Sequence, residues 1–361
     1  MKYWADKGVD GFRLDAFQFV VKDTAFPPFP EGFEKDFIQY YAMQEGIHEY
    51  INDMYNEVFS RYDVMTVAEG AGRNFDDAHK LVDEDRNELN MAYAFDAVDI
   101  AKYEGYKLKD LKEVFSRWDS AFAEKGWLSI FLANHDVARL VSRYGNDSTG
   151  YRIPSAKMLN TFLLSMRGTP YCYFGDELGM TNIDFDSIDD YQDIAAINGY
   201  KKAMAAGEDM DYFMKKLNFL SRDNGRTPMQ WDSTYNAGFT NGTPWLPVNE
   251  NYKTINVDAE EKNPNSVLNH FRKMTQLRTS QPALVYGSYS LFERDHPQVY
   301  AYYRILNDTR LLVLLNFSKT KAVIDLEEGV ESILINNYEN IDLKDTKTTL
   351  LPYQGVILKL K

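Results

Sequence analysis

The chain has 361 residues, of which 44% are hydrophobic and 14% aromatic, so it can bury a large core and form more than one domain. Its 40 Lys and Arg against 54 Asp and Glu leave a net charge of −14 at pH 7, which opposes binding to nucleic acids and to anionic membranes. The sequence also lacks a run of about 18 apolar residues, the length that a membrane-spanning helix needs.

Four short apolar runs occur in the first half of the chain, and each ends in polar residues and is followed by a helical pattern. They are "GVDGFRLDAF" (8–17), "YDVMTVAEG" (62–70), "WLSIFLANHD" (127–136) and "MRGTPYCYFGDE" (166–177). This alternation of strands and helices predicts an α/β fold with a parallel sheet. The run "NMAYAFDAVD" (90–99) is a weaker strand candidate, because the start of a helix would look similar.

A helix that buries one face is predicted between the first two runs. Its apolar residues follow the spacing i, i+3, i+4 and i+7. They are Ile47, Tyr50, Ile51, Met54, Tyr55 and Val58.

The composition of the second half of the chain changes twice. From about 180 to 262 the sequence is polar and aromatic, and so long an insertion is usually functional or disordered; its Trp and Phe residues favour order. A helix is predicted over 266–279. Short β-rich runs then follow, which predict a small antiparallel β domain. They are "YSLFE", "VYAYYRIL", "RLLVLLNF", "ESILINN" and "GVILKLK".

Metal and thiol chemistry are both disfavoured. The single Cys172 cannot form an internal disulfide, which agrees with a reducing compartment, and we expect a cytoplasmic protein. A buried, unreactive thiol is favoured over a nucleophile because no His lies near it in the sequence. The five His residues lack zinc-motif spacing, and the acidic stretch 182–193 lacks the Gly and the regular oxygen spacing of a calcium loop. The sequence therefore predicts no metal site and no cofactor.

Acidic residues close three of the apolar runs: Asp15 the first, Glu69 the second and Asp136 the third. Arg13 shares a face with Asp15, since residues i and i+2 of a strand point the same way. Catalytic groups of a parallel barrel lie at the carboxyl ends of its strands, so the three acids are expected to meet at one rim. Such a set suits glycosidic bond cleavage, which needs an attacking carboxylate and a proton donor. Taken alone, "RLD" would more often be a structural ion pair.

These residues also carry a family resemblance. "GFRLDAF", "TVAEG" and "FLANHD" resemble three sequence regions of the α-amylase superfamily, glycoside hydrolase family 13. "GDELGMTN" (175–182) and "SRDNGRTPMQWD" (221–232) are similar to its α-glucosidase and oligo-1,6-glucosidase branch. The resemblance covers essentially the whole chain. It implies the C-terminal part of a (β/α)8 TIM barrel, about strands 4–8, over residues 1–282, and a small antiparallel β-sandwich domain over 283–361.

The resemblance implies a role for each matched residue. Asp15 would be the nucleophile that forms a covalent β-glucosyl enzyme, and the positive charge of Arg13 would keep it ionised. Glu69 would be the general acid and then the base that activates water. Asp136 would clamp sugar hydroxyls and help to distort the ring, and His135 would hydrogen-bond the same sugar.

Two further arginines match family positions. Arg226, in "RDNGRTPMQWD", matches a residue that in this branch holds the far side of the terminal glucose and closes the pocket, which implies attack at the chain end. A loop-stabilising ion pair is the alternative for this residue. Arg139, just after "NHDVA", is expected to be a supporting ion-pair residue. By the same resemblance, the acidic stretch 182–193 is expected on a surface helix.

The chain departs from the family pattern at its front. The family's first region, on the third barrel strand, has no counterpart in residues 1–10, and "MKYWADKG" resembles the end of the helix before the fourth strand. We therefore expect a chain that begins within the barrel, without the inserted B domain and without a loop of calcium-ligand character. Little or no activity is expected of it alone, because four or five strands cannot close a barrel.

Three functions remain open at this stage. The leading one is an exo-acting, retaining α-glucosidase that hydrolyses short gluco-oligosaccharides; Ala16, where α-1,6-preferring relatives often have Val, favours α-1,4 bonds or mixed use. A sucrose isomerase or trehalose synthase would share the three acids, but the arginine-rich loop of sucrose isomerases is not evident. A non-catalytic relative, like the ectodomains that accompany amino-acid transporters, would have lost the acids. The sequence leaves the oligomeric state open.

Overall fold

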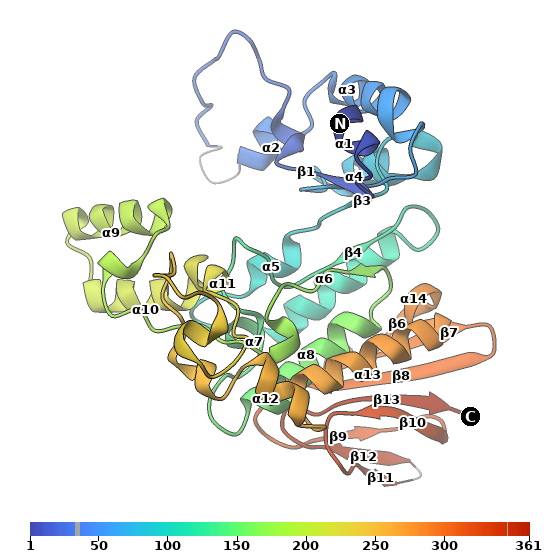
Figure 1. Cartoon of the computed structure of the whole chain (residues 1–361). Helices are drawn as coiled ribbons and strands as arrows, with labels where there is room; N and C mark the ends of the chain where they lie inside the picture. The colour runs from blue at the N-terminus through green and yellow to red at the C-terminus, as the bar shows by residue number, and fades with distance from the viewer. Residues whose placement is uncertain (33–36, 345) are drawn as a thin grey trace. The chain divides into compact units, whose positions relative to one another are not determined.

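The structure is a computed structural model that describes residues 1–32, 37–344 and 346–361. The chain divides into two compact units. The first unit comprises residues 1–96 and 117–130, and the second comprises residues 97–116 and 131–361. A three-stranded sheet belongs to the first unit, and a five-stranded and a second three-stranded sheet belong to the second (Figure 1).

Strands and helices alternate along the first unit, as predicted. Its strands are β1 (Gly11–Leu14), β2 (Met65–Ala68), β3 (Met91–Ala92) and β4 (Ser129–Ile130). Its helices are α1 (Lys2–Asp6), α2 (Phe37–Tyr41), α3 (Ile47–Met54) and α4 (Phe75–Val82), with short helical turns at Phe17–Phe19, Tyr55–Phe59 and Glu84–Arg86. Two helices include residues of both units, α5 (Asp96–Ile100) and α6 (Leu108–Ala121).

The sheet of the first unit is parallel, and its strand order follows the chain. β1 pairs with β2, β2 pairs with β3, and Ala92 at the end of β3 bridges Leu128 in parallel. Gly11 permits the close approach of β1 to β2, since a Cβ there would lie 2.4 Å from the carbonyl oxygen of Met65. The predicted parallel sheet is confirmed, and the run 90–99 supplies both β3 and the start of α5.

The predicted helix over 47–58 is α3 followed by a π-helical turn. Ile47, Ile51 and Val58 are buried, as the spacing predicts. Tyr50 is 60% exposed, which corrects its assignment to the buried face. The wider turn at Tyr55–Phe59 shifts the helical phase, so the spacing of a regular helix does not describe this whole segment.

The second unit contains nine strands and a larger set of helices among the described residues. Its strands are β5 (Thr169–Pro170), β6 (Ser288–Phe292), β7 (Val299–Leu306), β8 (Thr309–Asn316), β9 (Ala322–Asp325), β10 (Val330–Asn336), β11 (Asp342–Lys344), β12 (Lys347–Leu350) and β13 (Gly355–Leu360). Its helices are α7 (Leu140–Tyr144), α8 (Arg152–Ser165), α9 (Ile194–Ala206), α10 (Met210–Leu220), α11 (Asp223–Arg226), α12 (Val257–Lys262), α13 (Val267–Ser280) and α14 (Pro282–Tyr286).

The C-terminal strands form a two-layer antiparallel β domain, as predicted. A five-stranded sheet of order β10-β13-β8-β7-β6 faces a three-stranded sheet of order β11-β12-β9. Between the sheets lie side chains such as Val299, Leu312 and Ile324. The opposite face of the five-stranded sheet packs on α8, where Tyr302 bonds Ser165 (Figure 1). Strands buried on both faces read as continuous apolar runs, which is why β7, β8 and β13 stand out in the sequence.

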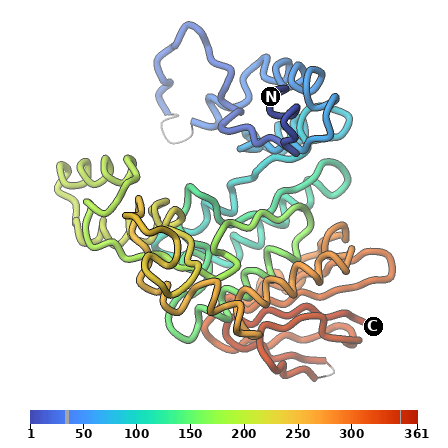
Figure 2. Tube along the Cα trace, in the orientation of Figure 1, coloured from blue at the N-terminus to red at the C-terminus, as the bar shows by residue number. Residues whose placement is uncertain are grey.

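The insertion over 180–262 is ordered and largely helical. It includes α9 and α10, which pack side by side (Figure 2), followed by α11 and α12. Within the acidic stretch only Ile188–Asp190 forms a short 3-10 turn, which corrects its predicted place on a helix; α9 begins at Ile194, after an Asp193 N-cap. In the described part of the chain no three His, Cys, Asp or Glu side chains are placed to hold a metal ion, and no helix could cross a membrane.

Candidate active site

Arg13, Asp15 and Glu69 meet at the carboxyl ends of β1 and β2. Arg13 Nη1 donates to Asp15 Oδ1 at 2.7 Å, and its Nη2 lies 2.8 Å from Glu69 Oε1. The strand register explains the meeting: Leu14 faces Ala68, so Asp15 and Glu69 are the next residues on two adjacent parallel strands. One guanidinium therefore spans both carboxylates.

The backbone turn after Asp15 tightens this arrangement. Ala16 adopts a left-handed conformation (φ 44°), and its N–H donates to Glu69 Oε2 at 2.8 Å. Glu69 thus accepts a hydrogen bond on Oε2 and forms an ion pair with Arg13 through Oε1. The side chain of Asp15 is 76% exposed and that of Glu69 only 19%. The apolar run around "RLD" thus ends in an accessible acid beside a sheltered one.

The predicted residues of the second unit form their own cluster around Asp136. Arg226 Nη2 donates to Asp136 Oδ1 at 2.8 Å, and Arg226 Nε donates to the carbonyl oxygen of His135 at 2.7 Å. His135 Nε2 lies 3.2 Å from Asp136 Oδ2. Asp136 is 37% exposed at its side chain, so a ligand can still reach it. That this cluster meets Asp15 and Glu69 on one sugar stays a prediction.

The contact of Arg222 with Asp136 was not predicted from the sequence. Its Nη1 lies 3.2 Å from Asp136 Oδ1, and its Nε lies 3.1 Å from Asp193 Oδ2. The signal was present in the sequence, because Arg222 and Arg226 stand four residues apart and therefore share a face of one helical turn.

Gly225 allows the arginine segment to approach Asp136. A Cβ at this position would lie 2.4 Å from the carbonyl oxygen of Val137, the residue after Asp136. The adjoining Asp223 is buried and accepts hydrogen bonds from the backbone N–H groups of Gln192 and Asp193. The segment is thus fixed from two sides, with its arginines directed at Asp136.

Arg139 supports this segment in another way than predicted. It is 1% exposed and donates to the carbonyl oxygens of Asn224, Phe174 and Thr227, with no carboxylate at ion-pair distance among the described residues. Burial lowers the pKa of Arg139 to about 10, although the nearby charge of Asp176 opposes this shift. The prediction of an ion pair is therefore wrong. Arg139 instead donates hydrogen bonds to the backbone carbonyl oxygens of three separate residues.

Cys172 corrects a second prediction. Its side chain is exposed rather than buried. The partial loss of water around the thiol, followed by the carboxylates of Asp176 and Glu177, raises its pKa well above the ordinary value. A thiol with a raised pKa is a weak nucleophile, in keeping with the predicted lack of reactivity.

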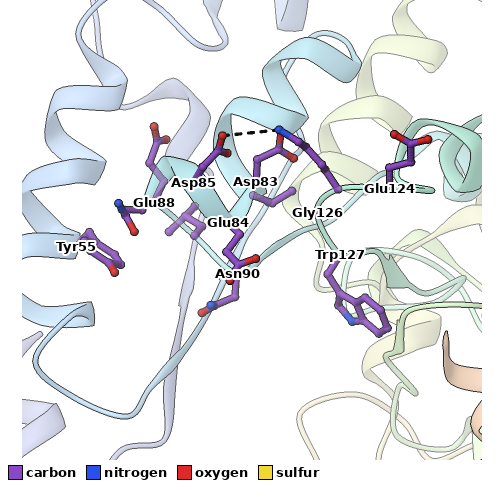
Figure 3. A pocket seen from close by; sticks show the side chains of 13 residues that line it. Tyr55, Asp83, Glu84, Asp85, Glu88, Asn90, Glu124, Gly126 and Trp127 are labelled. Carbon is purple, nitrogen blue, oxygen red and sulfur yellow. Dashed lines mark ion pairs between the residues drawn. The ribbon is translucent and has the colours of Figure 1, made fainter.

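The first unit contains a cavity of about 800 Å3 (Figure 3). It is lined by segments that lead into β3 and β4, including Asp83, Glu84 and Asn90, with Lys125 3.7 Å from Asp85. These segments precede the strands, whereas Asp15 and Glu69 follow theirs. In a parallel sheet, residues that precede the strands and residues that follow them lie at opposite ends of the strands, so this cavity is not the proposed catalytic site.

Comparison with known proteins identifies the family. The family model "Alpha amylase, catalytic domain" matches residues 1–287. The chain belongs to the α-amylase family. The model "Alpha-amylase SusG C-terminal domain" matches residues 299–357. The resemblance inferred from the strand-end motifs is thereby confirmed, as is the fold class, part of a (β/α)8 barrel followed by an antiparallel β domain. The domain boundary at 282 stays a prediction.

The chain spans about two thirds of the length of the relatives that it matches in the α-amylase family. It is 42% identical over 377 residues to the oligo-1,6-glucosidase of Parageobacillus thermoglucosidasius and 41% identical to that of Bacillus cereus. All of this chain and 67% of each relative are covered. Among solved structures, isomaltulose synthase from Klebsiella sp. LX3 superposes with a TM-score of 0.95 at 37% identity, covering 100% of this chain and 67% of that one.

Proposed function

We propose that the chain provides the catalytic acids of a retaining, exo-acting α-glucosidase acting on α-1,4 and/or α-1,6 bonds at the non-reducing end of short gluco-oligosaccharides. The observation that carries this proposal is the guanidinium of Arg13 bound to both Asp15 and Glu69. Retaining glycosidases hold two carboxyl groups about 5–5.5 Å apart. Neighbouring strand ends supply a spacing of that order.

In the proposed reaction Asp15 attacks the anomeric carbon while Glu69 gives a proton to the departing glycosidic oxygen. The C–O bond breaks and a covalent glucosyl ester forms. Glu69 then takes a proton from water, which attacks the same carbon and releases Asp15. Glu69 Oε2 accepts a hydrogen bond from the N–H of Ala16 and Glu69 Oε1 is paired with Arg13, so proton delivery to the sugar requires that one of these two contacts be released.

The Asp136 cluster is proposed to hold the terminal glucose. Asp136 and His135 present acceptor and donor atoms that suit sugar hydroxyls, and Arg226 orients Asp136. Two ion pairs, with Arg226 and with Arg222, fix the carboxylate of Asp136 before a sugar binds. A carboxylate that is already held in place lowers the entropy cost of binding the sugar ring in its distorted conformation.

The linkage preference is proposed to include α-1,6 bonds. The sequence argument from Ala16 favours α-1,4 or mixed use, whereas the similar relatives from Parageobacillus and Bacillus are named oligo-1,6-glucosidases. Initial rates on maltose and isomaltose, measured on the chain completed with the part of a relative that it does not cover, decide between the two, since a ratio of kcat/KM values measures preference directly.

Covalent trapping tests the catalytic assignment without depending on full turnover. A 5-fluoro-α-glucosyl fluoride has a leaving group that needs no proton, so Asp15 should become glucosylated and the ester should persist. Mass spectrometry of the digested protein locates the label. Asp15→Asn should remain unlabelled, and Asp10→Asn, an exposed acid before β1, should label normally. A label on another residue, or equal labelling of Asp15→Asn, would refute the assignment.

A second candidate function is sucrose isomerisation, because the solved structure with a TM-score of 0.95 is an isomaltulose synthase. The same two acids would form the glucosyl ester, and fructose would then replace water as the acceptor. Product analysis with sucrose separates the two functions. Glucose and fructose indicate hydrolysis, whereas isomaltulose or trehalulose indicates isomerisation.

A further inference from the structure

A second cavity, in the second unit, has chemistry unlike that of the catalytic acids. Its volume is about 390 Å3, within the usual range for small-molecule sites. It lies where the start of α8 and the start of α13 meet the end of β10. Its lining includes Lys157 from α8, Lys273 from α13, and Asn336 from β10. We call it the Lys157 pocket.

Lys157 is a buried cation without a matching anion. The residue is 7% exposed, and its ammonium has three donors, of which one reaches the carbonyl oxygen of Asn265 at 2.5 Å. Within residues 1–32, 37–344 and 346–361, no carboxylate lies at ion-pair distance from Lys157 or from Lys273. Burial of a charge is costly unless it is paired, so an anion beside Lys157 would stabilise it.

The nearest buried carboxylate is already engaged. Glu260 Oε2 accepts hydrogen bonds from the backbone N–H groups of Val267 and Leu268, at the start of α13, and Glu260 Oε1 lies 3.6 Å from Arg152. These contacts also occupy two backbone N–H groups at the start of α13, so the helix terminus itself is not a free site for an anion. Loss of water lowers the pKa of Lys157, and although Glu260 opposes this shift, Lys273 adds to it. The two lysines therefore repel each other across the pocket.

The other lining groups suit a polyol. Asn265 carries a side-chain amide that can donate to and accept from hydroxyl groups. Asn336 can offer its amide N–H groups, because its side-chain oxygen already accepts hydrogen bonds from Tyr338 N–H and Gln354 Nε2. Glu339 is the one acidic residue in the described lining. A cavity of about 390 Å3 is larger than a phosphate ion needs. We propose that the Lys157 pocket binds a small phosphorylated sugar, with Lys157 and Lys273 holding the phosphate group and the amides facing the sugar. This site is separate from the proposed glucosidase site and does not depend on it.

Thermal unfolding and calorimetry at constant ionic strength test the proposal. Glucose 6-phosphate should raise Tm saturably by about 2 to 5 °C, because it binds only the folded pocket. Lys273→Gln, at an exposed position that should not disturb folding, should weaken binding at least tenfold. Lys202→Gln, an exposed lysine on α9 outside the pocket, should bind like the unmodified chain. Lys157→Met should abolish binding if it folds.

Inorganic phosphate and glucose are the comparison ligands. Binding of inorganic phosphate that is lost in Lys273→Gln would support the lysine pair as the phosphate site. Equal binding of glucose and glucose 6-phosphate would overturn the proposal, as would an unchanged affinity in Lys273→Gln. Absence of any shift with glucose 6-phosphate would overturn it as well.

Discussion

Arg13 holds two carboxylates through different nitrogens of one planar group. A lysine would present a single point charge on a flexible stem and could not span both acids in a fixed geometry. The residue type at position 13 therefore matters as much as its charge. Arg222 likewise reaches two carboxylates, those of Asp136 and Asp193, through different nitrogens.

The contact between Arg222 and Asp136 supplies a test at the level of a single residue. Arg222→Met removes one of two guanidinium groups from Asp136 Oδ1 while Arg226 keeps its own contact. In the chain completed with the part of an oligo-1,6-glucosidase relative that it does not cover, we expect kcat/KM on an aryl α-glucoside to fall about tenfold, equivalent to about 1.4 kcal/mol, because Asp136 becomes less well positioned. Steady-state kinetics provide the measurement.

Arg272→Met is the matched control for this variant. Arg272 forms an exposed ion pair with Glu261 at the surface of α13, away from Asp136, so its loss should leave kcat/KM unchanged. If Arg222→Met behaves like Arg272→Met, Arg222 is a surface ion-pair residue and has no positioning role.

Residue-level prediction from the sequence succeeded where a side chain acts at its own strand end. The meeting of Asp15, Glu69 and Arg13 was predicted correctly because strand register brings them together, while their catalytic roles stay predictions. Arg222 could not be assigned in this way, because its partner Asp136 lies 86 positions away and the approach depends on the bare backbone of Gly225. Cys172 was misplaced because an apolar sequence neighbourhood does not fix which side chains face solvent.

The segment that contains α11 gives a test at the level of an element. Gly225→Ala would place a Cβ 2.4 Å from the Val137 carbonyl oxygen, which is backbone and cannot swing away. We expect the free energy of unfolding to fall by about 1–3 kcal/mol. Activity should fall too, since Arg222 and Arg226 flank this glycine. Denaturant unfolding measures the first effect and kinetics the second.

Gly199→Ala is the counterpart on a regular helix. Gly199 lies inside α9, where an added Cβ would meet only Phe213, at 3.5 Å. Removing a glycine from a helix interior should raise the free energy of unfolding by about 0.5–1 kcal/mol. A stabilised Gly225→Ala variant would show that α11 does not depend on close contact with Val137.

Some elements were visible in the sequence because burial dictates their pattern. β7, β8 and β13 are buried on both faces and appear as unbroken apolar runs. β9 was missed although it alternates, with Ala322 and Ile324 buried, because its outward residue Val323 is also apolar and 49% exposed. The short strands β11 and β12 were missed because each offers a single apolar residue, Leu343 and Leu350, and the other buried residue of β12, Thr348, is polar.

Asp176 supplies a test at the level of the whole molecule. It is 3% exposed, and burial raises its pKa to about 7, although the charge of Arg139 opposes this shift. The folded chain therefore binds this proton more tightly than the unfolded chain, whose Asp has the ordinary pKa of about 3.8. The resulting stabilisation is fully present below about pH 4 and is lost as the pH rises through about 7.

Asp176→Asn removes this dependence on pH. We expect the Tm of the variant relative to the unmodified chain to increase between pH 5 and pH 8, because the variant need not bury a charge at the higher pH. Asp147→Asn, at an exposed loop position, should show no such trend. A Tm difference for Asp176→Asn that stays constant from pH 5 to pH 8 would mean that Asp176 remains ionised across this range.

The separation of the Asp15 and Glu69 carboxyl groups follows from the spacing of neighbouring strands, about 4.8 Å in any parallel sheet. Surface loops do not set it, since Asp15 and Glu69 directly follow paired residues of β1 and β2. Loops around the sugar can therefore lengthen, diverge or be exchanged in engineering without pulling the two groups apart. Selection for a new substrate can then act on these loops while the proposed pair of reacting carboxyl groups keeps its spacing.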